Sequence, residues 1–78
     1  MERYRNLSGR SGVVSYEIGR GSIAVEFTDG WIYLYTAQST GADDVAEMQR
    51  LARAGSGLST YISRFVRERY ERKYQRGN

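Results

Sequence analysis

The chain has 78 residues, with twelve basic and nine acidic side chains and neither cysteine nor histidine. This length suffices for one domain, which buries only about 60% of the surface that its unfolded chain exposes. Without cysteine, disulfides and thiolate metal sites are excluded. Without histidine, the chain lacks the commonest zinc ligand and the side chain best suited to proton transfer near pH 7. We therefore expect no metal, no cofactor and no enzymatic activity.

The first 12 residues are polar and end in Ser8-Gly9-Arg10-Ser11-Gly12. Such a composition buries too little apolar surface to order itself, so we predict a flexible N-terminal arm over residues 1–12. The N-terminus carries no apolar run of signal-peptide length, and no stretch of the chain approaches the length of a membrane span. These features predict a cytoplasmic protein that does not associate with membranes.

Three strands are expected next, over about 13–18, 22–28 and 31–36. The middle one has the clearest alternation, with Ile23, Val25 and Phe27 on one face and small or polar residues on the other. Tight turns at Gly19-Arg20-Gly21 and at Asp29-Gly30 separate the three segments, because glycine readily adopts the positive φ that such turns need. The pattern predicts an antiparallel meander.

Two helices are expected after the strands, over about 41–54 and 58–72, with Gly55 just past the end of the first. The apolar residues recur at helical spacing: Val45, Met48, Leu51 and Ala52 in the first helix, then Leu58, Tyr61, Ile62, Phe65 and Val66 in the second. After Val66 this apolar stripe fails. We predict one α+β domain over 13–74, with both helices packed on one face of the sheet and a frayed C-terminus at 75–78.

The turn at Asp29-Gly30 can be built in two ways that expose opposite faces of the third strand. A two-residue loop directs Ile32 and Leu34 toward the helices and leaves Tyr33 and Tyr35 on the open face. A three-residue loop, with Gly30 left-handed in a bulge, directs Tyr33 and Tyr35 toward the helices instead. A shift of one residue exchanges every side chain between the faces, and the local sequence allows both registers.

The run from Val14-Ser15-Tyr16 to Trp31-Ile32-Tyr33-Leu34-Tyr35 resembles the KTSC domain. This short domain occurs at the C-terminus of some lysyl-tRNA synthetases and as a free-standing bacterial protein. Its mark is a Tyr-x-Tyr motif after an Asn/Asp-Gly turn, matched here by Tyr33 and Tyr35. The resemblance spans about residues 13–70 and implies RNA binding by the family's context. It also favours the register in which both tyrosines face the helices.

The C-terminal segment concentrates the positive charge. Residues 58–78 hold six basic and two acidic side chains, whereas residues 1–57 hold six basic and seven acidic ones. Basic side chains release counterions from phosphates, and aromatic rings stack on bases. The candidate nucleic-acid-binding residues are Arg64, Arg67, Arg72, Lys73, Tyr70 and Tyr74. A charged run of this kind is also typical of a solvated helix end that keeps a small domain soluble.

Two functions are consistent with these features. The first is binding of RNA or another nucleic acid through the basic C-terminal helix. The alternative is a module for protein interaction or self-association that uses the open face of the sheet.

Overall fold

The computed structural model of the chain describes residues 1–76. Within these residues five strands form one antiparallel sheet whose spatial order follows the sequence order. They are β1 (Glu2–Arg3), β2 (Val13–Gly19), β3 (Ser22–Phe27), β4 (Trp31–Thr36) and β5 (Arg72–Gln75). The predicted α+β class is confirmed, and the predicted meander corresponds to β2, β3 and β4.

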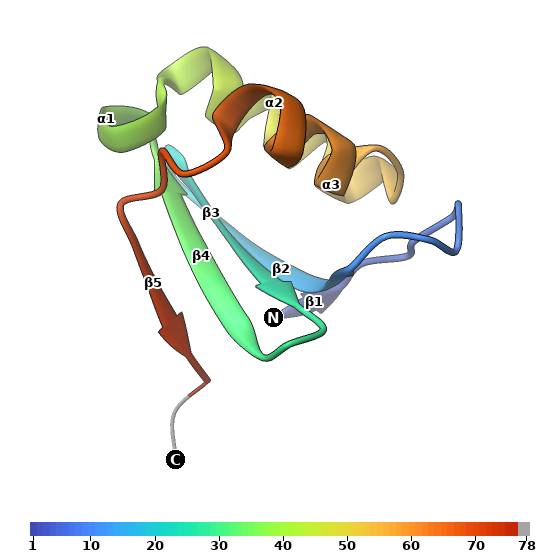
Figure 1. Cartoon of the computed structure of the whole chain (residues 1–78). Coiled ribbons are helices and arrows are strands. Elements are labelled where there is room, and N and C mark those ends of the chain that lie inside the picture. Colours follow the sequence, from blue (N-terminus) through green and yellow to red (C-terminus); the bar gives the residue numbers. More distant parts are fainter. Residues whose placement is uncertain (77–78) are drawn as a thin grey trace.

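The helices lie together on one face of the sheet, as predicted (Figure 1). A short α1 (Ala37–Thr40) leads into α2 (Ala42–Ala54), and after a joint at residues 55–57 follow α3 (Leu58–Tyr61) and the π-helical segment η1 (Ile62–Val66). No helix among residues 1–76 is both long enough and apolar enough to cross a bilayer. Gly55 ends α2 in the left-handed conformation, with φ of 76°, which confirms its predicted place.

The core lies between the helices and one face of β2, β3 and β4. Three fully buried sheet residues, Ile23, Val25 and Tyr35, form its floor. The helices cover this floor with the apolar residues that the spacing predicts: Val45, Met48, Ala52, Leu58, Ile62 and Val66. Each fully buried Val, Leu, Ile or Met side chain stabilises the fold by roughly 1.5–3 kcal/mol, so the helices are held by packing on the sheet.

The β3–β4 hairpin adopts the three-residue loop. Val25 pairs with Tyr33 and Ile23 pairs with Tyr35, so all four side chains share the helix-facing side of the sheet. Gly30 has φ of 91°, and its amide donates to the carbonyl of Phe27 at 2.9 Å. The register favoured by the Tyr-x-Tyr motif is therefore the one observed.

The N-terminal segment differs from the flexible arm that its composition predicts. Glu2–Arg3 pairs with β2, and Tyr4 is only 3% exposed in the core. The hydroxyl of Tyr4 accepts a hydrogen bond from the amide of Leu58 at 3.2 Å, and the amide of Leu7 donates to the carbonyl of Gly55 at 2.8 Å. One buried ring and a few long-range hydrogen bonds thus order a segment whose average composition is polar.

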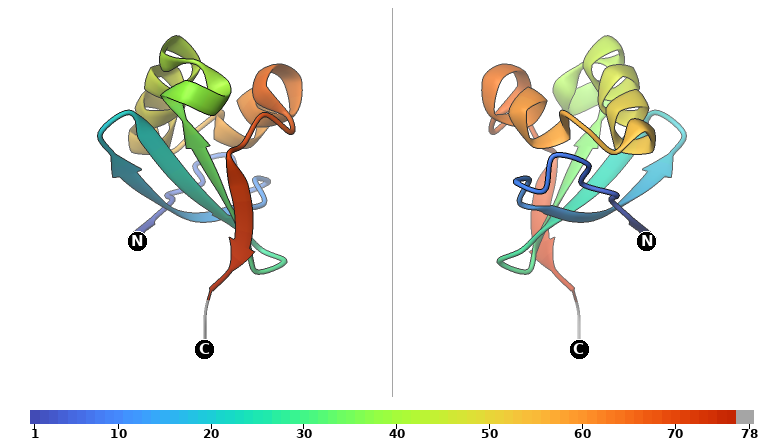
Figure 2. Two further views of the ribbon diagram at one scale, coloured as in Figure 1. Left: turned by 90° about the vertical axis from the view of Figure 1, so that its left-hand side faces the viewer. Right: turned by 90° about the vertical axis from the view of Figure 1, so that its right-hand side faces the viewer.

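The second predicted helix is too long, because the helical conformation ends at Val66 and not near 72. Arg67 has φ of 45°, which turns the chain out of the helix, and residues 72–75 then pair with β4 as the edge strand β5 (Figure 2). Continuing the helix would bury the charged groups of Arg69 and Arg72, whereas the observed path leaves both side chains exposed. Gln75 of the predicted frayed end belongs to β5, and residues 77–78 lie outside the described residues.

Candidate nucleic-acid interface

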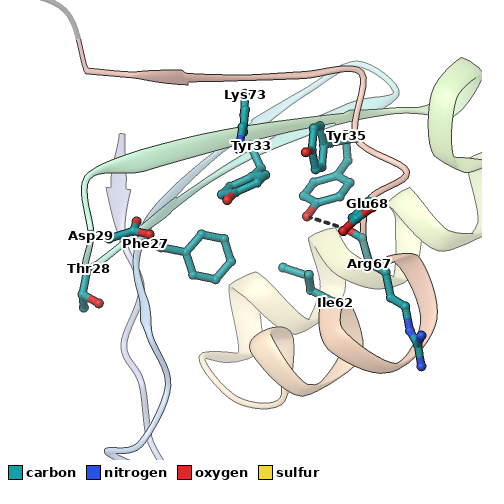
Figure 3. A pocket seen from close by; sticks show the side chains of 10 residues that line it. Phe27, Thr28, Asp29, Tyr33, Tyr35, Ile62, Arg67, Glu68 and Lys73 are labelled. Carbon is teal, nitrogen blue, oxygen red and sulfur yellow. Dashed lines mark hydrogen bonds between the residues drawn. The ribbon is translucent and has the colours of Figure 1, made fainter.

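A cleft of about 450 Å³ opens on the helix-facing side of the sheet, beyond the end of η1. The β3–β4 turn, the last turn of η1 and the start of β5 surround it (Figure 3). Four aromatic residues contribute to its lining, namely Phe27, Tyr33, Tyr35 and Tyr70. The cleft is thus a gap in the cover of the core, where Tyr35 is buried and Phe27, Tyr33 and Tyr70 are only partly buried.

The aromatic rings of this cleft pack edge to face. The ring centroid of Tyr33 lies 5.4 Å from that of Phe27 and 4.9 Å from that of Tyr70. Tyr70 also lies 6.2 Å from Tyr35, again with the rings nearly perpendicular. Such pairs contribute about 0.5–1.5 kcal/mol each beyond their burial. They hold Tyr33, which is only partly buried, with a fixed ring plane at the wall of the cleft.

Lys73 supplies a cation at the rim of the cleft. Its Nζ lies 5.0 Å from the ring centroid of Trp31 and 6.0 Å from that of Tyr33. The attraction of an exposed ammonium to a ring face is worth about 0.5–1 kcal/mol. This places one exposed positive charge directly beside the aromatic wall.

Arg67 lines the cleft with its backbone and directs its side chain elsewhere. Its carbonyl oxygen accepts a hydrogen bond from the Tyr35 hydroxyl at 3.5 Å, while its Nε donates to the carbonyl of Ser63 at 3.2 Å. The guanidinium therefore points away from the aromatic rings (Figure 3). Its φ of 45° and ψ of −113° form a strained combination for a residue with a side chain, and strain of this kind is often found at functional sites.

Two carboxylates also line the cleft. Asp29 is occupied within its own turn, because its Oδ1 accepts the amide of Trp31 at 3.0 Å. Glu68 follows Arg67 in the chain and lines the cleft across from Asp29 (Figure 3). Within residues 1–76 it forms no ion pair. The lining therefore combines stacking surfaces with both cationic and acceptor groups.

The structure brings together only part of the predicted site. Arg67, Tyr70 and Lys73 meet at the cleft, whereas Arg72 and Tyr74 belong to the opposite face of the sheet, where the Arg72 guanidinium lies 5.2 Å from the Tyr74 ring. Successive residues of a strand point to opposite faces. Lys73 therefore lies on the face opposite to Arg72 and Tyr74, whereas the predicted helix would have placed these residues around one axis. Arg64 is exposed on η1 and does not line the cleft.

Two further arginines of the basic segment are occupied by ion pairs. Arg69 contacts Asp44 at 2.7 Å, and Arg76 contacts Glu26 at 2.5 Å. Hydrogen bonds from Tyr61 and Arg69 lower the pKa of Asp44, and the same carboxylate raises the pKa of Tyr61 to about 12. Arg69 and Arg76 therefore anchor the C-terminal segment to the domain.

Sequence reasoning missed Phe27 and Glu68 as part of the site. The alternation of β3 placed Phe27 on the apolar face, but only the tertiary structure shows that no helix covers it there. Glu68 lines the cleft because the helix ends before it. The failure of the apolar stripe after Val66 is the one sequence signal that could have indicated this end of the helix.

Comparisons with protein-family models, with curated proteins and with solved structures gave no match for this chain. Within residues 1–76, no group of three or more acidic side chains lies close enough together to hold a metal ion.

Proposed function

We propose that this domain binds single-stranded nucleic acid, with a base in the aromatic cleft and the adjoining phosphates near the rim. The observation that carries the proposal is the partly buried Tyr33 ring, held edge-on by Phe27 and Tyr70 beside the ammonium of Lys73. Stacking of one base on an aromatic side chain is worth about 1–3 kcal/mol and depends little on sequence.

Exposed cations around the cleft support the same proposal. Lys73 stands at the rim, and the exposed side chains of Arg64 and Arg67 add positive charge on and just after η1, whereas Arg72 lies on the opposite face of the sheet. Because Arg69 and Arg76 are engaged with carboxylates, the phosphate contacts fall to the other basic residues. The resemblance to the KTSC domain favours RNA over DNA as the ligand.

Titration of a fluorescent single-stranded RNA of random sequence at several salt concentrations tests the proposal. We expect the affinity to fall with rising salt, and Lys73→Ala to lower both the affinity and the slope, the slope by about one. Arg20→Ala is the matched control, because it removes the same charge from the turn between β2 and β3. Absence of binding at low salt, or equal effects of the two variants, would contradict the proposal.

A second candidate function is interaction with another protein through the outer face of the sheet. No helix of the described residues covers this face, and a shallow groove of about 180 Å³ lies on it. Glu17, Ala24, Leu34 and Arg72 stand side by side across four strands and line the groove. An apolar centre between opposite charges is a surface that a partner with complementary charges can recognise.

A further inference from the structure

The hydroxyl of Tyr35 is a buried donor with a weak partner. Tyr35 is only 1% exposed, and its hydroxyl reaches the carbonyl of Arg67 at 3.5 Å, the outer limit of a hydrogen bond. Burial raises the pKa of this phenol, so the group keeps its proton. Buried polar groups are normally well satisfied, and Tyr35 contributes to the wall of the cleft (Figure 3). A stronger acceptor on a ligand in the cleft would therefore have only this weak hydrogen bond to replace.

Acceptors lie on the same side of the cleft. The carbonyl of Arg67 faces the Tyr35 hydroxyl because of the positive φ at this residue, and the carboxylate of Glu68 follows directly. A ligand that fits this wall therefore presents an acceptor to Tyr35 and, beside it, a donor to Arg67 or Glu68.

We propose that the cleft selects bases that carry a carbonyl next to a ring N–H, which are uracil and guanine. Tyr35 donates to the base carbonyl, and the N–H donates to the Glu68 carboxylate or the Arg67 carbonyl. Adenine and cytosine present an amine beside an unprotonated ring nitrogen, so that nitrogen would face an acceptor and the Tyr35 hydroxyl would face a donor. Sites built on such hydrogen bonds reject ligands that leave buried polar groups unpaired.

This selection rests on the proposed binding of single-stranded nucleic acid. Comparing oligouridine with oligocytidine, each of eight nucleotides, tests the selection separately from the binding. The bases have the same size and differ at the edge in question. We expect oligouridine to bind roughly tenfold more tightly than oligocytidine, which is the order of discrimination from one good pair of base contacts. Oligouridine methylated at N3 lacks the ring N–H and should bind like oligocytidine, a result that requires no change to the protein.

Tyr35→Phe keeps the ring and removes the hydroxyl. The ratio of the affinity for oligouridine to that for oligocytidine should therefore fall toward one. Tyr16→Phe is the matched control, because Tyr16 is a buried tyrosine of β2 that does not line the cleft. Circular dichroism checks that both variants fold. If Tyr35→Phe does not fold, the selection is tested with the N3-methylated ligand on the unmodified protein.

The possible results are distinct. Equal, salt-dependent binding of oligouridine, oligocytidine and the N3-methylated ligand overturns the selection and leaves the proposed function standing. A uridine preference that survives in Tyr35→Phe overturns the role of the hydroxyl. Failure of every oligonucleotide to bind at low salt overturns both proposals.

Discussion

At the scale of single residues, Gly55 connects the helices to the N-terminal segment. Its φ of 76° lies in the left-handed region, and a Cβ atom added here would lie 2.8 Å from the Cβ of Arg5. Arg5 is fixed in turn, because its guanidinium donates to the carbonyl of Arg53 at 2.6 Å. The glycine is therefore required both by the backbone conformation and by the close approach of a second segment.

This double requirement predicts the effect of Gly55→Ala. The left-handed conformation should cost about 1 kcal/mol, and displacement of Arg5 should add roughly 1 kcal/mol or more. Gly9→Ala is the matched control, since Gly9 has the same φ of 76° and nothing within 4 Å of the added methyl group. Urea unfolding measures both variants, and equal losses of unfolding free energy would show that the N-terminal segment does not press on Gly55.

At the scale of elements, β5 is attached by its ends as well as by its pairing with β4. The amide of Glu71 donates to the carbonyl of Leu34 at 2.7 Å, at one end of the strand. At the other end, Arg76 reaches across the sheet to Glu26, which also accepts a hydrogen bond from Ser15 at 2.7 Å. These contacts hold a short, charged edge strand in place.

The hydrogen bonds from Arg76 and then Ser15 lower the pKa of Glu26. The folded protein therefore keeps this carboxylate ionised at a pH where the unfolded chain binds a proton. The resulting stabilisation is complete above the ordinary glutamate pKa, about 4.3, and is lost as the pH falls through the lower folded value.

Accordingly, Glu26→Gln should lower the unfolding free energy at pH 7, and its difference from the wild type should shrink toward pH 3. Because Arg76 is 60% exposed, solvent screens the pair and limits the loss to roughly 1 kcal/mol. Glu47→Gln is the control, since Glu47 pairs with Arg50 on the exposed surface of α2 and should change stability little. A loss that stays constant between pH 7 and pH 3 would contradict this account of Glu26.

The predictions of secondary structure are correct where the spacing of nearby residues determines the element. They are wrong where contacts between distant segments determine it. The alternation in β3 and the helical spacing up to Val66 reflect one buried face, which a short window of sequence reports. The edge strands β1 and β5 have two and four residues. Strands this short carry too few residues for a pattern, and they form because β2 and β4 offer unpaired edges.

At the scale of the whole molecule, the helices occupy one side of the sheet, and nothing within residues 1–76 forms a second layer on the other side (Figure 1). Part of this outer face is closed by its own side chains. Ile32 is 3% exposed, and Arg76 extends from the edge toward Glu26 and the sulfur of Met1. Leu34, at the floor of the shallow groove, remains partly exposed.

If the outer face mediates self-association, the protein should form dimers whose population rises with concentration. Leu34→Lys should abolish them, because it places a charge in the contact. Leu7→Lys is the control, since Leu7 is an exposed leucine of the N-terminal segment. Sedimentation equilibrium measures the masses, and a monomer at millimolar concentration would exclude self-association while leaving a different protein partner open to test.

The sequence by itself determined the α+β class, the central meander, the apolar faces of the helices and the left-handed end of α2. These features depend on residues close in the chain, whose spacing specifies which side is buried. Only the tertiary structure decided the hairpin register, because both loops at Asp29-Gly30 satisfy the local chemistry. The packing of the core determines whether Tyr35 or Leu34 faces the helices. The tertiary structure also decided the path of the basic segment, which leaves the helix where further turns would bury charge and instead builds the rim of the aromatic cleft.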